Sequence, residues 1–156
     1  MKSIKPPQKV DFAKARNTLF LAGAIDNGAA DPWQKQIEEA LADRDVTILN
    51  PRRDDWDPTW EASTNNKSFV EQVNWELDGM ENAETILFYF PANSKAPITL
   101  LELGLYGTPQ KGVIFCPDAF WRSGNVQIVA KRRGVPLYKD HNEFVEAIIG
   151  LFPAAP

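Results

Sequence analysis

A single glutamate, Glu102, stands in an otherwise apolar stretch of the chain, APITLLELGLYG (96–107). A carboxylate buried without a partner costs several kcal/mol or takes up a proton. Pro97 suits the first turn of a helix, which places Glu102 in the second turn, flanked by Leu101 and Leu105 as candidates for the core. Two interpretations follow. Either Glu102 faces water from one side of the helix, or the protein keeps it in a pocket for chemistry.

Two further acids, Glu76 and Asp78, lie in the segment 68–83, where apolar residues recur at helical spacing. Side chains two residues apart on a helix point in different directions, so only one of these acids is expected to reach a shared site. The residues alone do not choose between them.

Small and polar residues follow the predicted strands. Gly23 and Asp26 stand in a turn of small residues after the first strand, where a ligand can approach the backbone. The second strand ends in NPRRDDWD (50–57), which contains Asn50, Arg52, Asp55 and Trp56. That loop is suited to bind a sugar, a base or a phosphate, or else it is a solvated loop with internal ion pairs.

The composition excludes several other kinds of chemistry. With one cysteine and one histidine in 156 residues, the chain has no internal disulfide framework and no cysteine- or histidine-rich metal centre. A net charge of −4 and a pI of about 5.0 argue against nucleic acid or an anionic membrane as a partner. No dinucleotide-binding fingerprint or P-loop is present. The sequence lacks a signal-peptide core and any run of membrane-spanning length, so we expect a cytoplasmic protein.

The elements that must position these residues alternate strand and helix five times. Apolar strands joined through helices by short turns predict a parallel sheet covered on both faces. We therefore expect an α/β fold, a single-domain flavodoxin/Rossmann-like three-layer sandwich with a five-stranded parallel sheet over 17–152, after a flexible leader at 1–16. In such sheets ligands bind at the carboxyl ends of the strands, beside the switch in strand order. The predicted strands are 17–25, 46–49, 84–90, 111–117 and 135–138, and the predicted helices are 31–43, 68–83, 97–107, 125–134 and 141–152.

Several segments together resemble the nucleoside 2-deoxyribosyltransferase family, in its branch with an N-P-R-R-x-D-W-D loop. They span about residues 18 to 138 and occur in the same order at the predicted strand ends. The segments are LFLAGAID (19–26), LNPRRDDWD (49–57), NWELDGMENAETIL (74–87), PITLLELGLY (97–106) and CPDAFWRSGN (116–125).

The resemblance implies roles for three groups of residues. Glu102, in the family's E-x-G motif, would attack the anomeric carbon, and Glu76 would contact the nucleobase, with Asp78 as a second candidate. Asn125 would bind the sugar 5′-hydroxyl in a neighbouring subunit, although as the first residue of a predicted helix it could equally be a cap.

Two positions depart from the family pattern. The family tyrosine of the first strand, which hydrogen-bonds the nucleophile, is Phe20 here. A family aspartate six residues before the nucleophile is Ala96, so base recognition would fall to Asn93 or Ser94.

The function that the resemblance implies is double-displacement transfer of 2-deoxyribose between nucleobases, without a metal or an organic cofactor. The expected partners are 2′-deoxynucleosides, free nucleobases and further copies of the chain in a homo-oligomer. Two alternatives stay open: an N-glycosidase of nucleosides or their 5′-monophosphates, and a non-catalytic nucleotide-binding module.

Overall fold

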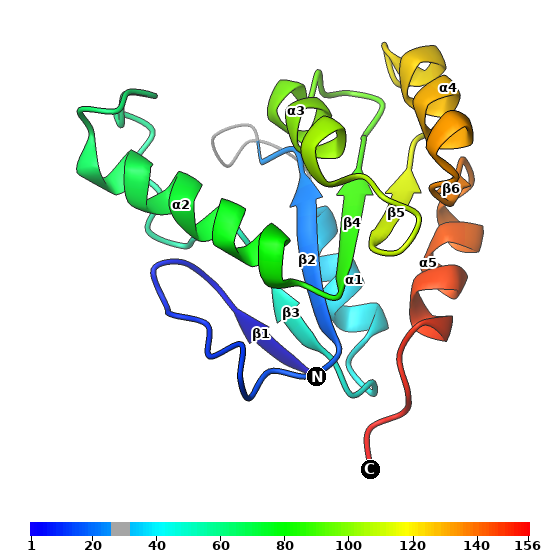
Figure 1. Cartoon of the computed structure of the whole chain (residues 1–156), viewed down its shortest axis with the longest axis horizontal. Coiled ribbons are helices and arrows are strands. Elements are labelled where there is room, and N and C mark those ends of the chain that lie inside the picture. Colours follow the sequence, from blue (N-terminus) through cyan, green and yellow to red (C-terminus); the bar gives the residue numbers. More distant parts are fainter. Residues whose placement is uncertain (26–31) are drawn as a thin grey trace.

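The computed structural model describes residues 1–25 and 32–156. In this part of the chain, six parallel strands form one sheet in the order β1-β3-β2-β4-β5-β6 (Figure 1). The strands are β1 (Lys2–Ile4), β2 (Thr18–Gly23), β3 (Thr47–Leu49), β4 (Thr85–Tyr89), β5 (Gly112–Phe115) and β6 (Leu137–Tyr138). The helices are α1 (Trp33–Ala40), α2 (Lys67–Asn82), α3 (Pro97–Tyr106), α4 (Ser123–Arg133) and α5 (His141–Gly150).

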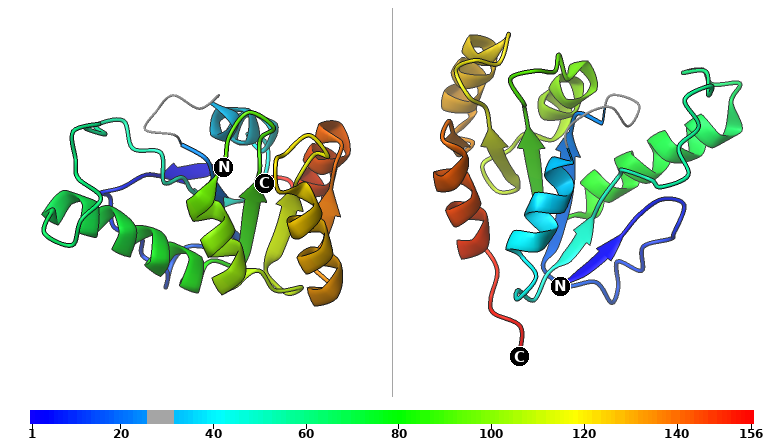
Figure 2. Two further views of the ribbon diagram at one scale, coloured as in Figure 1. Left: turned by 90° about the horizontal axis from the view of Figure 1, so that it is seen from above. Right: turned by 180° about the vertical axis from the view of Figure 1, so that it is seen from behind.

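Helices cover both faces of the sheet (Figure 2). The side chains of α1 and α5 pack on one face, and those of α2, α3 and α4 on the other. In β2, Leu19 and Leu21 point to the first face and Phe20 and Ala22 to the second, and all four are at most 2% exposed. A strand that is apolar on both sides needs a helical layer on each side, so the predicted three-layer α/β sandwich is confirmed. None of the helices in the described residues is long and apolar enough to cross a membrane.

The N-terminal residues differ from the expected flexible leader. Lys2–Ile4 forms β1, which pairs in parallel with β3, and Ile4 is buried. Val10 and Phe12 then pack against the core. The sheet therefore has six strands rather than five, with β1 in place of β3 as the edge strand on this side.

The face that α3 turns to the sheet also differs from the prediction. Leu101 and Leu105, expected in the core, are 59% and 58% exposed. The residues that face inward are Thr99, Glu102 and Leu103. Residues three and four positions apart lie on the same side of a helix, so these three side chains face inward together. The acid is therefore in the interior, and the two leucines are on the opposite side.

Candidate active site

Glu102 lies on the inner side of α3 and is 7% exposed. Its helix follows β4 and lies near the carboxyl ends of β2 and β4, where the strand order reverses (Figure 1). Burial, and after it the charge of Glu76, raises the pKa of Glu102 to about 8. The interpretation that Glu102 faces water is therefore wrong, and the carboxyl sits where ligands bind in folds of this kind.

Glu76 comes from α2, the helix before β4, and is partly buried. Its Oε1 accepts a hydrogen bond from Gln72 Nε2 at 2.7 Å. Burial raises the pKa of Glu76 to about 7, and the hydrogen bond from Gln72 acts in the opposite direction. Because the charge of Glu76 contributes to the raised pKa of Glu102, the two carboxyls are close enough to interact electrostatically.

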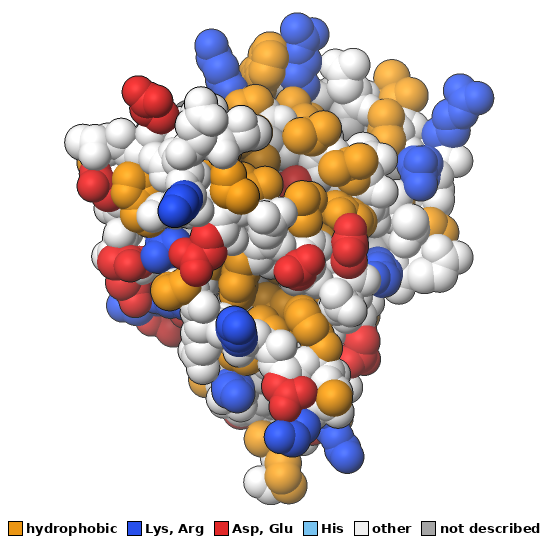
Figure 3. All heavy atoms as spheres, turned by 60° about the vertical axis from the view of Figure 1, so that its left-hand side comes forward, with side chains coloured by type: hydrophobic (Ala, Val, Ile, Leu, Met, Phe, Trp, Pro, Cys, Tyr) orange, Lys and Arg blue, Asp and Glu red, His pale blue; other side chains and the backbone are white. Residues whose placement is uncertain are grey.

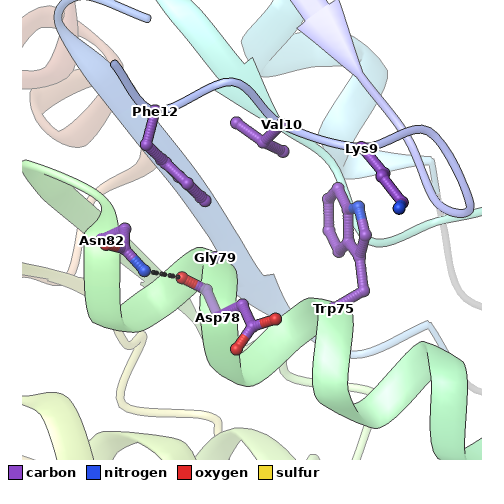
Figure 4. Close-up of a pocket in the computed structure, with 7 residues that line it drawn as sticks. All are labelled: Lys9, Val10, Phe12, Trp75, Asp78, Gly79 and Asn82. Carbon is purple, nitrogen blue, oxygen red and sulfur yellow. Dashed lines mark hydrogen bonds between the residues drawn. The ribbon is translucent and has the colours of Figure 1, made fainter.

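Asp78 lies on a different side of α2 and is exposed. It lines a groove of about 380 Å³ that runs between α2 and the N-terminal segment (Figure 4). Other walls of this groove are Trp75 from α2 and Lys9 and Phe12 from the N-terminal segment. Of the two acids that the sequence left open, Glu76 is thus the one that acts on Glu102.

The loop after β3 begins with residues that are bound to α1 and to the end of β3. Asn50 is 2% exposed, and its Nδ2 donates to Glu38 Oε1 at 2.9 Å. Its Oδ1 accepts from the backbone N–H of Arg52 at 3.0 Å, and Arg52 Nη1 donates to Gln34 Oε1 at 3.4 Å. Asn50 therefore fixes the conformation of the start of this loop. A contact of Asn50 or Arg52 with substrate stays a prediction.

Further along the loop, Arg53 and Asp55 form the internal ion pair that one interpretation expected. The Arg53 side chain is 5% exposed, and it donates from Nε and Nη2 to the two carboxylate oxygens of Asp55 at 2.7 and 3.0 Å. This contact lowers the pKa of Asp55. The guanidinium lies 4.9 Å from the ring centre of Trp60, which meets Trp56 edge to face. Trp56 Nε1 is buried without a hydrogen-bond partner in the described structure.

Comparison with models of known protein families identifies the family of this chain. A family model described as nucleoside 2-deoxyribosyltransferase like matches residues 16–120. The chain belongs to the nucleoside 2-deoxyribosyltransferase-like family. The matched segment contains Glu76, Glu102 and the loop after β3, and it ends before α4. No curated protein matches the chain.

In this deoxyribosyltransferase-like chain no tyrosine takes over the position of Phe20. Phe20 is 1% exposed and belongs to the core beneath α2. The hydroxyl of Tyr106 donates to Glu81 Oε1 at 3.2 Å, and Tyr89 stacks on Trp33 on the opposite face of the sheet. The hydrogen bond of the Tyr106 hydroxyl is thus made to Glu81 and not to Glu102, and Tyr89 belongs to the other face of the sheet. A hydrogen bond from a phenolic hydroxyl would lower the pKa of Glu102. The raised pKa of Glu102 agrees with a site that has no such donor.

The small residue at Gly23 has a packing explanation in this family member. A Cβ added at Gly23 would overlap the ring of Trp33, which is 2% exposed. The indole Nε1 of Trp33 donates to the carbonyl of Ala24 at 3.1 Å, which locks α1 against the end of β2. A role of Gly23 in sugar binding stays a prediction, and Asp26 lies outside the described residues.

The two asparagines are both exposed. Asn93 stands in the turn before α3, next to Ser94, whose Oγ accepts from the backbone N–H of Ala96 at 3.2 Å. Asn125 is the third residue of α4, and the cap position is Arg122, so the prediction that Asn125 caps the helix is wrong. Its side chain is thus available from the surface near the start of α4.

Sequence reasoning missed Gln72, which binds the candidate acid. The only signal in the sequence is its position four residues before Glu76, a spacing that puts two side chains on the same side of a helix. That spacing is too common to single out a functional residue without the tertiary contacts.

Proposed function

We propose that this chain transfers 2-deoxyribose between nucleobases by double displacement, with Glu102 as the nucleophile. The observation that carries the proposal is the pair formed by Glu102 and Glu76, two carboxyls with raised pKa values on the helices that flank β4. Cleavage of a glycosidic bond with a covalent intermediate uses such a pair, one carboxyl as nucleophile and the other as acid and base. Membership of the family supports the choice of a nucleoside as the glycoside.

In the first step, a carboxylate oxygen of Glu102 attacks C1′ of a 2′-deoxynucleoside, and the bond from C1′ to the base nitrogen breaks. The electron pair of that bond goes to the base, which takes a proton from Glu76. In the second step, an incoming base attacks C1′ of the glycosyl ester, its proton goes to Glu76, and the carboxylate of Glu102 leaves. Atoms and charge balance over the two steps, without a metal or an organic cofactor.

The reaction requires a proton on Glu76 and the negative charge on Glu102. In the ligand-free chain both pKa values are raised, to about 8 for Glu102 and to about 7 for Glu76, so the bound substrate has to favour the carboxylate of Glu102. The positive charge that develops at C1′ lies beside Glu102 in the proposed reaction. It favours the carboxylate there and so moves the proton to Glu76.

The proposed partners are 2′-deoxynucleosides and free nucleobases. Gly23, Asp26 and Asn125 would position the sugar, and the loop 50–57 with Asn93 would contact the base. On the face drawn in Figure 3, acidic and basic side chains are interspersed. Together with the net charge of −4, this distribution favours a small-molecule substrate over nucleic acid, which binds to surfaces dominated by positive charge.

An exchange assay tests the proposal. The protein is incubated with a panel of 2′-deoxynucleosides and free bases, and new nucleosides are separated by chromatography. We expect new nucleosides only when an acceptor base is present, and a deoxyribosyl adduct on the intact protein when it is absent. Free deoxyribose as the main product, from nucleosides or their 5′-monophosphates, would instead assign an N-glycosidase.

The pH dependence of kcat/KM is expected to be bell-shaped with a maximum between pH 7 and 8. Below about pH 7 both carboxyls keep their protons and no nucleophile is present; above about pH 8 both are ionised and no proton reaches the leaving base. Initial rates from pH 5 to 9.5 measure this profile. Glu76→Gln should lose the alkaline limb, whereas Asp78→Asn should keep both limbs; the reverse result would assign the acid role to Asp78.

We further propose that the chain forms a homo-oligomer, a dimer or a multiple of dimers. On α3, Ile98, Leu101 and Leu105 form an apolar stripe whose members are 60%, 59% and 58% exposed. A second copy that covers this stripe would remove it from water. Asn125 on the adjacent α4 would then lie near the neighbouring copy, as the family resemblance implies.

The charges beside the stripe fit a two-fold arrangement. On one side of α3, α2 exposes Asp78 and Glu81, and on the other side α4 ends in the basic run 131–133. A two-fold axis parallel to α3 would bring α2 of each copy against α4 of the other, so that opposite charges meet. Light scattering should give at least twice the chain mass of 17.5 kDa, and Leu101→Asp should reduce it. A monomeric wild type would contradict this proposal.

A further inference from the structure

Gln72 is the buried amide on which the candidate acid depends. It is 3% exposed and lies on α2, one turn before Glu76. Its Nε2 donates two hydrogen bonds, one to the carbonyl of Pro51 at 2.9 Å and one to Glu76 Oε1 at 2.7 Å. Both amide protons are thus used, and they tie the loop after β3 to the acid through a single side chain.

The carbonyl oxygen of Gln72 has no such partner. Oε1 is buried and accepts no hydrogen bond from the described residues. The orientation of the amide is determined, because a reversed amide would set its oxygen against the carbonyl oxygen of Pro51, which can only accept. An unpaired buried carbonyl destabilises the folded state, because it has lost its hydrogen bonds to water without replacing them. Such a group in a folded protein calls for a ligand or another explanation.

Gln72 is linked to the candidate site through its hydrogen bond to Glu76. Gln72 and Glu76 are four residues apart, so the free carbonyl and the acid lie on the same side of α2. The loop that Gln72 holds through Pro51 also contains Trp56, whose buried Nε1 lacks a partner among the described residues. One acceptor on α2 and one donor on the loop after β3 are therefore both buried without a hydrogen-bond partner among the described residues.

We propose that Gln72 is a positioning residue for Glu76 and that its Oε1 accepts a hydrogen bond from an N–H group of the bound nucleobase. The proposal rests on the proposed function, and it defines the substrates further: bases with an exocyclic amino group or a ring N–H are preferred over analogues without one. Because one amide contacts both the base and the acid, the proton donor is held in place when a matching base is bound.

The first test compares substrate pairs that differ in one N–H. The pairs are 2′-deoxyadenosine or 2′-deoxycytidine against the analogue that lacks the amino group, and thymidine against its N3-methyl analogue. For a base class that the enzyme accepts, wild type should prefer the N–H form by about tenfold in kcat/KM, the value of one hydrogen bond. Gln72→Met, which removes the carbonyl at similar volume, should abolish this preference, so that the two substrates of a pair have about the same kcat/KM.

The second test does not need turnover. In the ligand-free protein, ¹³C-carboxyl NMR follows the titration of Glu76, which begins from a pKa of about 7. Gln72→Met should raise this midpoint by about 1 pH unit, because the hydrogen bond that stabilises the carboxylate is lost. Besides Gln72, burial is what shifts the pKa of this carboxyl; Glu102 is the titratable group on which its charge acts, and the cation Arg53 is paired with Asp55 and Glu71.

Gln127→Met is the matched control, because Gln127 is a helical glutamine on α4 whose Nε2 donates to a different carboxylate, Asp118. It should change neither the substrate preference nor the Glu76 midpoint. If Gln72→Met does not fold, Gln72→Asn replaces it, since the shorter side chain cannot reach both Pro51 and Glu76.

The outcomes separate this proposal from the proposed function. If wild type shows no turnover, calorimetry of free bases and their analogues replaces kcat/KM, and a preference lost in Gln72→Met still supports the role of Gln72. If turnover is present but Gln72→Met keeps both the wild-type preference and the wild-type midpoint, the role of Gln72 is overturned while the transferase function stands.

Discussion

Replacing Glu102 by glutamine is expected to reduce base exchange by about 10⁴-fold or more. The amide has nearly the same shape as the carboxyl, but it cannot form a glycosyl ester with C1′, so the covalent route is closed. Glu102 is buried on the inner face of α3 and no second carboxyl of that helix faces inward. The site therefore offers no substitute nucleophile on α3.

The measurement is the initial rate of exchange together with the intact mass of the protein after incubation with 2′-deoxynucleoside alone. Wild type should carry the deoxyribosyl adduct and Glu102→Gln should not. Glu81→Gln is the matched control: it removes an exposed carboxyl on α2 that contacts Tyr106, and it should exchange at the wild-type rate. Base exchange by Glu102→Gln at the wild-type rate would contradict the proposed mechanism.

The same substitution is expected to stabilise the protein at alkaline pH. Glu102 has a pKa of about 8 in the folded chain and 4.5 as an unperturbed group. The folded state therefore binds more protons than the unfolded state between pH 4.5 and 8, and the free energy of unfolding falls as pH rises through this window. Glutamine has no proton to lose and escapes this effect, so above pH 8 the free energy of unfolding of the variant should exceed that of wild type by up to roughly 5 kcal/mol.

Thermal unfolding at pH 4.5, 7 and 8.5 measures this difference. We expect Glu102→Gln and wild type to have the same Tm at pH 4.5. At pH 8.5 the Tm of the variant should be higher by roughly 10 °C, because about 1 kcal/mol moves Tm by about 2–4 °C in a domain of this size. Glu81→Gln should follow wild type at every pH. A Tm difference that does not change with pH would mean that Glu102 is not held in a site that favours its protonated form.

Both expectations have one physical cause. The environment that keeps Glu102 away from water also makes its charge costly, so removing the charge should strengthen the fold and remove the activity together. Glu76 shares this environment and adds to the cost through its own charge. Stability is thus expected to be highest where both carboxyls keep their protons, below the pH at which the pair can react.

Much of the fold could be predicted from local patterns. Apolar strands such as 19–22, separated by segments with helical spacing, indicated a parallel sheet with helices on both faces, and that fold is confirmed. The same reasoning missed β1, because a polar segment rich in lysine and proline carries no strand pattern. Its pairing depends on the open edge of β3 instead.

The candidate site divides in a similar way. The sequence by itself determined that Glu102 is an unusual acid and that Glu76 and Asp78 point in different directions, since residue type and helical spacing are local properties. Only the tertiary structure decided that Glu102 faces inward while Leu101 and Leu105 face out, that Glu76 is the acid beside it, and that Gln72 holds Glu76. These facts depend on which side of each helix meets the sheet and on the loop at Pro51, 21 residues before Gln72 in the chain. Contacts across such separations follow from packing of the whole domain, and no local pattern encodes them.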